Sequence, residues 1–175
     1  MSNGPWQRAD HFVRLLLPGF TVLALIVLGA LPWPLPFISG IAPPFGLIAV
    51  VFWALRRPGI FSPLGMFLLG LLQDFLAGHP LGVCAFAFVA VHLLCGDRIR
   101  QLVGGSFSLA WLVLSGAMLA TLLLQAGVFV LFHGLMVPFE PLILQFAVIV
   151  GSYPLAVSAF LAPVAEVLPR VEELA

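Results

Sequence analysis

Asp74 is the residue of this sequence with the clearest capacity for chemistry, because of its residue type and its setting. It is the only acidic residue inside the apolar runs that are long enough to predict membrane spans. A carboxylate at the centre of a bilayer costs about 2.5–3.5 kcal/mol on insertion scales, so its presence requires a compensating partner. Gly70, Asp74 and Gly78 recur every fourth residue, and they therefore share one face of a helix.

Three interpretations of Asp74 remain open at this level. A structural clasp would accept hydrogen bonds from a neighbouring backbone, which the two glycines allow to approach closely. A binding or ion-coupling residue would instead use its charge to hold a cation. In the third interpretation the acid lies near the membrane interface and its side chain reaches the headgroup region.

The other reactive residue types do not assemble a site in the sequence. The histidines are scattered at His11, His79, His92 and His133. They form no HExxH motif and no i,i+4 ligand pair, so no metal site is predicted. Cys84 and Cys95 lack CxxC spacing and are predicted to be small buried hydrophobes. Without a lysine there is no P-loop, and there is no GxSxG elbow or aspartate pair. We therefore expect no catalytic residues, no cofactor and no enzymatic activity.

The composition predicts that membrane-spanning helices position these residues. Hydrophobic residues make up 62% of the 175 positions and charged residues only 8%, whereas soluble domains have about 25% charged residues. The mean hydropathy is +1.19. The net charge is zero, so no basic surface for nucleic acid is expected. All the basic residues are arginines at the ends of apolar runs, namely Arg8, Arg14, Arg56, Arg57, Arg98, Arg100 and Arg170.

Six spans are predicted, because a span needs about 17–25 mostly apolar residues. They are expected at about residues 15–31, 41–55, 60–77, 81–96, 107–132 and 142–165 of a single transmembrane domain, 1–175. A proline cluster between residues 32 and 44 predicts a turn after the first span. This all-α bundle is N-in/C-in and places every arginine on the cytoplasmic side. Trp33, Trp53 and Trp111 lie near span ends and are expected at the lipid–water interface.

The first span also has features of a signal peptide, since a basic start precedes its apolar core. That core is long for the role, and Leu28-Gly29-Ala30-Leu31 is a poor small-residue cleavage site. We therefore expect a membrane span. Cleavage would leave five spans and would not change the side on which the arginines lie.

Two segments resemble the MreD family of rod shape-determining membrane proteins. The first is FWALRRP at residues 52–58, and the second is LGLLQDFLAGHPLG at residues 69–82. In that family a WALRRP-like span end is followed, at this spacing, by a GLLxDxLxGxPLG-like segment. By this resemblance Arg56, Arg57 and Pro58 form the basic cytoplasmic turn of the family. The main signature corresponds to Gly70, Asp74, Gly78, Pro80, Leu81 and Gly82. Gly78 and Gly82 are expected to provide positive φ in a tight turn.

The resemblance implies a non-catalytic scaffold of cell shape in the bacterial inner membrane. It further implies binding of an MreC-like protein, and through it association with MreB, RodA and the elongation transpeptidase in lateral peptidoglycan synthesis. An alternative is the substrate-binding membrane subunit of a vitamin or metal transporter. Asp74, His92, Gln125 and Gln145 would then line a pocket. Cell rounding on depletion would favour the scaffold, and loss of uptake would favour the transporter.

Overall fold

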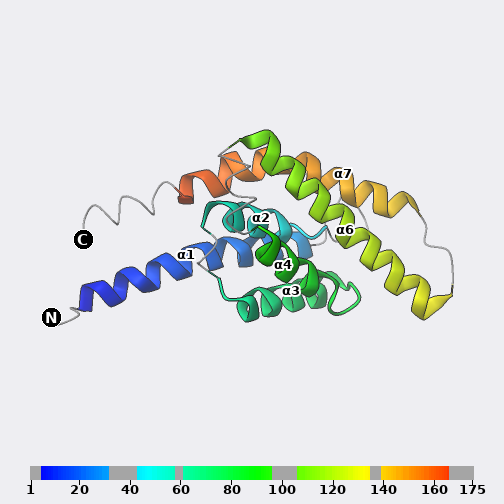
Figure 1. Ribbon diagram of the computed structural model, residues 1–175, viewed down its shortest axis with the longest axis horizontal. Helices are drawn as coiled ribbons and strands as arrows, with labels where there is room; N and C mark the ends of the chain where they lie inside the picture. The colour runs from blue at the N-terminus through cyan, green and yellow to red at the C-terminus, as the bar shows by residue number, and fades with distance from the viewer. Residues whose placement is uncertain (1–4, 32–42, 58–60, 96–105, 135–138, 166–175) are drawn as a thin grey trace.

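The computed structural model describes residues 5–31, 43–57, 61–95, 106–134 and 139–165, with side chains from Leu17 onward except that of residue 133. Within these residues every regular element is a helix, in agreement with the predicted all-α class. The helices are α1 (Pro5–Ala30), α2 (Gly46–Arg56), α3 (Pro63–Ala77), α4 (Val83–Leu94), α6 (Phe107–His133) and α7 (Phe139–Ala156). A π-helix, η1 (Val157–Leu161), continues α7 (Figure 1).

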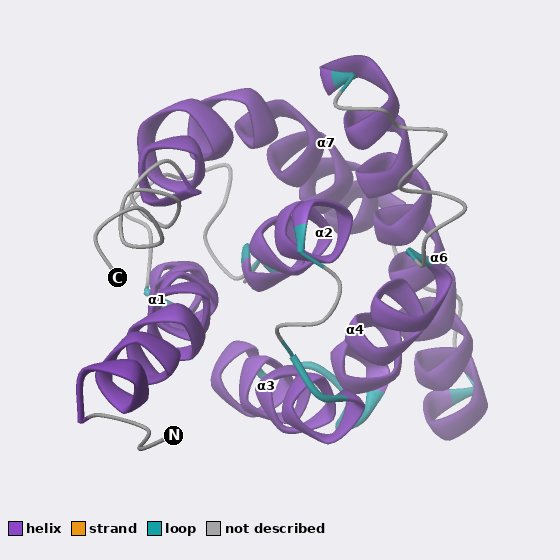
Figure 2. Cartoon of the chain, turned by 60° about the vertical axis from the view of Figure 1, so that its left-hand side comes forward, coloured by secondary structure: helices purple, strands orange, loops and turns teal. Residues whose placement is uncertain are grey.

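α2 is the central helix of the bundle. It packs against α1, α4, α6 and α7, as the view of Figure 2 shows. Every residue from Gly46 to Leu55 is buried. Its 11 residues rise about 16 Å, roughly half of the ~30 Å thickness of a bilayer core. Because protein surrounds α2, a short helix is tolerated there if protein groups satisfy the backbone at its ends.

α3 and α4 form an antiparallel pair below α2 in the view of Figure 1. α3 begins at a local signal: the Ser62 hydroxyl accepts the Gly65 N–H at 3.1 Å, and Pro63 occupies the first helical turn. Proline is favoured there because its missing N–H has no intrahelical partner at that position. α3 ends at Gly78, whose φ of 68° is left-handed.

α6 and α7 form the opposite layer of the bundle and pack against each other (Figure 1). α6 is apolar along residues 107–132, and the helix that starts as α7 is apolar along residues 139–165. Both are long enough to cross a membrane. Pro154 lies inside α7, and the π-helix follows it.

The predicted spans correspond to the observed helices, with different ends at several of them. The first helix starts at Pro5 and contains Pro18, so it is longer than the predicted span at 15–31. The second starts at Gly46 instead of residue 41, because Pro43 and Pro44 precede its first turn. The fifth, at 107–133, ends one residue beyond the prediction. The proline-rich residues 32–42 lie outside the described residues.

The position of Trp53 differs from the one predicted. It was expected at the lipid–water interface, but it is fully buried, and its indole N–H donates to Thr21 Oγ1 at 2.9 Å. The reason is that α2 is the central helix, so an aromatic side chain near its end still points into protein. Trp111, near the start of α6, is partly exposed, whereas Trp33 lies outside the described residues.

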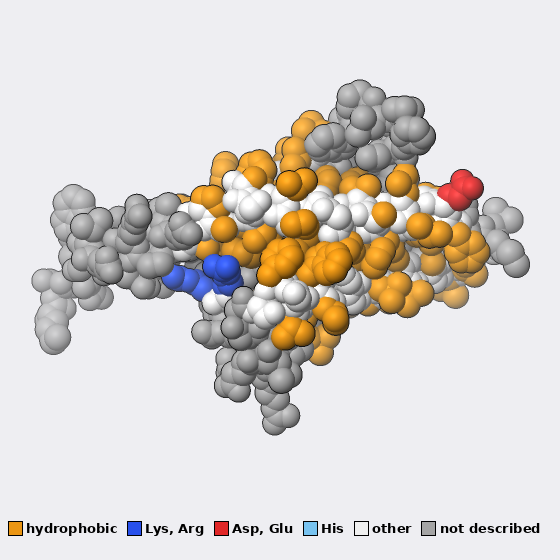
Figure 3. Space-filling model, turned by 90° about the horizontal axis from the view of Figure 1, so that it is seen from above, with side chains coloured by type: hydrophobic (Ala, Val, Ile, Leu, Met, Phe, Trp, Pro, Cys, Tyr) orange, Lys and Arg blue, Asp and Glu red, His pale blue; other side chains and the backbone are white. Residues whose placement is uncertain are grey.

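The exterior of the bundle is apolar. Large hydrophobic side chains such as Phe75, Leu131, Phe132 and Phe139 are exposed, and Figure 3 shows such side chains along the length of the molecule. The described arginine side chains, those of Arg56 and Arg57, lie at one end in that view, and the described acidic side chain lies at the opposite end. Among described residues the exposed acid is Glu140. An outer surface of this kind matches a lipid environment, because soluble proteins rarely expose large contiguous apolar patches.

Candidate functional site

Asp74 lies in the last turn of α3 and its side chain is completely buried. Its carboxylate accepts the backbone N–H groups of Gly82 at 2.9 Å, Cys84 at 3.0 Å and Ala85 at 3.4 Å. Gly82 is the N-cap of α4, and the other two belong to its first turn. An N-cap side chain normally supplies these acceptors from within the same helix. Here the carboxylate comes from the preceding helix, and its charge also complements the positive end of the α4 dipole.

The main chain of Asp74 closes α3 in the same region. Its carbonyl oxygen accepts the N–H groups of both Gly78 and His79, the latter at 3.0 Å. One residue therefore terminates α3 through its backbone and starts α4 through its side chain. The turn between the helices has positive φ at Gly78 (68°) and Gly82 (103°), in agreement with the predicted turn glycines. The Pro80 carbonyl accepts the Val83 N–H at 3.3 Å.

Gly70 lies one turn before Asp74, where the backbone of α4 lies close against α3. A Cβ atom at this position would lie 2.3 Å from Ala85 Cα and 2.6 Å from Ala85 N. Only glycine fits without moving the α4 backbone. The signature residues Gly70, Asp74, Gly78, Pro80 and Gly82 thus lie together in one helix–turn–helix contact.

Gln73 holds a second helix start, and sequence reasoning missed this role. Its side-chain oxygen accepts the Gly46 N–H at 3.3 Å, at the first residue of α2. A Cβ atom on Gly46 would lie 2.8 Å from that oxygen. Neighbouring residues of α3 therefore cap α2 and α4. The signal for Gln73 was weak, because glutamine can satisfy many kinds of partner in an apolar helix.

A small polar cluster lies beside the clasp, that is, the hydrogen bonds from the N–H groups of Gly82, Cys84 and Ala85 to the Asp74 carboxylate. His79 Nδ1 lies 3.7 Å from Cys84 Sγ and 3.9 Å from Asp74 Oδ1. On the other side of the imidazole ring, His79 Nε2 lies 3.4 Å from the Gln145 side-chain amide of α7. The sequence does not indicate that these residues are neighbours, because their proximity depends on the turn and on the packing of α7.

Of the four residues that would line the pocket of a transporter subunit, the structure brings two together. Asp74 and Gln145 both lie against His79. His92 and Gln125 show no hydrogen bond to this cluster in the described part of the chain. His92 lies in the last turn of α4, eight residues along the helix from Cys84, or about 12 Å at the usual rise.

The basic turn lies at the end of α2. The Arg56 guanidinium carbon is 4.7 Å from the centre of the Phe52 ring, a cation–π contact. The Arg57 N–H donates to the Trp53 carbonyl at 2.7 Å and closes the helix.

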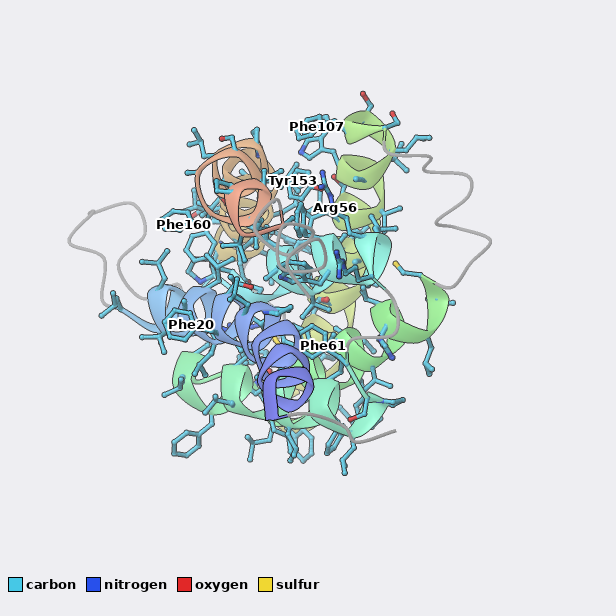
Figure 4. All side chains as sticks on the ribbon, turned by 90° about the vertical axis from the view of Figure 1, so that its left-hand side faces the viewer. Phe20, Arg56, Phe61, Phe107, Tyr153 and Phe160 are labelled. Carbon is cyan, nitrogen blue, oxygen red and sulfur yellow. The ribbon has the colours of Figure 1, made fainter. Side chains whose placement is uncertain are left out.

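Figure 4 shows Arg56 at the end of the bundle where Tyr153 and Phe107 also lie. The rings of Tyr153 and Phe107 are 5.5 Å apart. Pro58 lies outside the described residues.

Helices with an apolar exterior, two of them long enough to cross a membrane, and buried polar groups bonded to helix ends are compatible with a helical membrane protein. The family model described as rod shape-determining protein MreD matches residues 10–168. The chain therefore belongs to the MreD family, as its two sequence motifs predicted. Members of this family are membrane proteins that determine rod shape. No curated protein and no solved structure matches the chain.

Proposed function

We propose that this protein is a non-catalytic scaffold of the cell-elongation machinery in the bacterial inner membrane. It takes part in lateral peptidoglycan synthesis by binding an MreC-like partner and through it acts with MreB, RodA and the elongation transpeptidase. The observation that carries the proposal is the family match over residues 10–168. The buried Asp74 adds support, because its carboxylate already bonds to three backbone N–H groups of α4. These bonds give the carboxylate a structural role at the start of α4.

We also propose six spans with both termini in the cytoplasm. Among the described side chains, Arg56 and Arg57 lie at one end of the molecule and Glu140 lies at the other (Figure 3). This separation supports the orientation, because cytoplasmic loops carry an excess of arginine and lysine. The short α2 is compatible with six spans, since the surrounding helices separate it from lipid.

The proposed partner surface is the outer face of the helices. Most residues of α6 and α7 are not buried within the bundle. In a bilayer such faces contact either lipid or another transmembrane helix, and packing between helices relies on close van der Waals contact. We propose that the MreC-like partner contacts one of these faces.

Depletion followed by complementation tests the function. Cells that lose the protein should become round, and expression of the wild-type chain should restore rods. The same cells are assayed for uptake of vitamins and metal ions. Normal rod shape with lost uptake would contradict the scaffold and favour the transporter subunit. Co-purification of the MreC-like protein with the wild-type chain, at matched abundance, tests the partner separately.

A further inference from the structure

We propose that Asp74, His79 and Cys84 bind a Zn²⁺ ion at the turn between α3 and α4. The inference is independent of the role in cell shape and departs from the expectation drawn from the sequence. The three residues are spaced five apart, a pattern that places them on no common helix face. The turn at Gly78–Gly82 nevertheless brings one potential ligand atom from each residue within 4.8 Å of the others.

Two of the three pairs of ligand atoms have separations close to those around a tetrahedral ion, and the third pair, Cys84 Sγ and Asp74 Oδ1, lies within 4.8 Å. Bond lengths of ~2.3 Å to sulfur and ~2.0–2.1 Å to nitrogen imply a sulfur–nitrogen separation of about 3.6 Å. Cys84 Sγ and His79 Nδ1 are 3.7 Å apart. The nitrogen–oxygen separation in such a site is about 3.4 Å, and His79 Nδ1 lies 3.9 Å from Asp74 Oδ1. A shift of the imidazole by about half an ångström closes this difference.

The clasp leaves Asp74 able to act as a ligand. The N–H groups of Gly82 and Ala85 bond to Oδ2, and the N–H of Cys84 is shared between the two oxygens. Among the described residues, the shared N–H of Cys84 is the one backbone donor to Oδ1, and a carboxylate oxygen has two lone pairs. This less occupied oxygen is the one nearest His79. Capping of α4 and coordination of an ion can thus use different oxygens of one carboxylate.

Gln145 supplies the support that a metal-binding histidine requires. A histidine ligand generally donates its other ring N–H to a neighbouring acceptor, which fixes the tautomer. The Gln145 amide lies 3.4 Å from His79 Nε2. The oxygen and nitrogen of an amide are interchangeable by a flip of its end. With the oxygen toward Nε2–H, the lone pair of Nδ1 points to the side where Cys84 and Asp74 lie.

The donor set selects the ion. Thiolate and imidazole together favour Zn²⁺ over the oxygen-seeking Mg²⁺ and Ca²⁺. Three protein ligands leave the fourth position to water. Binding replaces the Cys84 thiol proton, which is released to solvent, so affinity should increase as the pH is raised. The side chain of His79 is 8% exposed and that of Asp74 is fully buried, so an ion would enter past the histidine.

Metal binding to the full-length chain tests the proposal. The protein is purified in detergent without a histidine tag, treated with a chelator, incubated with ZnCl₂ and desalted before metal analysis. About one equivalent of zinc should remain. Cys84→Ser and His79→Gln should each weaken binding at least tenfold, and Gln145→Leu should weaken it by about 10–100-fold. Cys95→Ser and His92→Gln are matched controls and should bind like the wild type.

Co²⁺ provides a readout that does not depend on any variant folding correctly. A cobalt–thiolate charge-transfer band in the wild-type protein, together with visible bands of a tetrahedral ion, would support the site. Absence of the thiolate band at saturating Co²⁺ would overturn it. Zinc retention by Cys84→Ser equal to that of the wild type would overturn it as well.

Discussion

The indole N–H of Trp111 donates to the carbonyl oxygen of Val150 at 2.9 Å and joins α6 to α7. Val150 is four residues before Pro154, so this carbonyl is the one that proline leaves without an intrahelical donor. A side chain of α6 therefore satisfies a gap in the backbone ladder of α7. This explains how α7 tolerates an internal proline in a setting where water is not available.

Replacing Trp111 with phenylalanine should destabilise the protein by about 1 kcal/mol, because the Val150 carbonyl loses its donor while most of the aromatic packing remains. The measurement is the free energy of unfolding in mixed detergent micelles. Pro154→Ala restores a backbone N–H to the same carbonyl. In that background Trp111→Phe should cost clearly less, and equal costs in both backgrounds would refute the relationship between Trp111 and the proline.

Asp74→Asn and Asp74→Leu should differ strongly. Asparagine keeps one oxygen, which can still accept the N–H groups of Gly82 and Ala85. Leucine leaves them without an acceptor, at about 1–3 kcal/mol for each unsatisfied donor. We expect the leucine variant to lose folded protein and co-purification of the proposed MreC-like partner, and the asparagine variant to keep much of both.

The same pair of variants separates structure from charge. Rod shape and partner binding are compared at matched abundance of the two proteins. If asparagine fails as severely as leucine, rod shape and partner binding require the negative charge of Asp74 in addition to its hydrogen bonds. Wild-type behaviour from both variants would show that the clasp is dispensable.

The sequence predicted the features that depend on local pattern. The limits of α6 were accurate because residues 107–132 form an uninterrupted apolar run without proline, and Gly134 follows in a left-handed conformation. The turn glycines were accurate because a Gly-x-Pro-x-Gly segment cannot continue a helix. The pairing of Gln73 with Gly46 was not accessible, because it joins residues 27 positions apart. Burial of Trp53 was missed because nothing in its local sequence indicates that α2 is central.

Gly70→Ala should be strongly destabilising. The added methyl carbon would lie 2.3 Å from the Ala85 Cα atom, so α3 and α4 must separate and the N–H groups of α4 move away from Asp74. Overpacking of this kind costs about 1–3 kcal/mol, and here it acts on backbone that cannot change rotamer.

Gly116→Ala is the matched control, because no atom lies within 4 Å of a Cβ placed there. In the middle of α6 alanine is the better helix former, so this variant should be neutral or stabilised by up to about 1 kcal/mol. Both variants are compared by thermal unfolding of the purified proteins in detergent. Equal unfolding temperatures would show that α3 and α4 do not pack as closely as this arrangement requires.

Reporter fusions at the two ends of the bundle should give opposite results. A phosphatase that is active only in the periplasm should give a strong signal when fused after Gly134, near the end that carries Glu140. The same reporter should give no signal after Arg57. The physical reason is the positive-inside bias, which retains short arginine-containing turns in the cytoplasm. A reporter active only in the cytoplasm should give the complementary pattern at both positions. Periplasmic activity after Arg57, without activity after Gly134, would reverse the proposed orientation of the whole bundle.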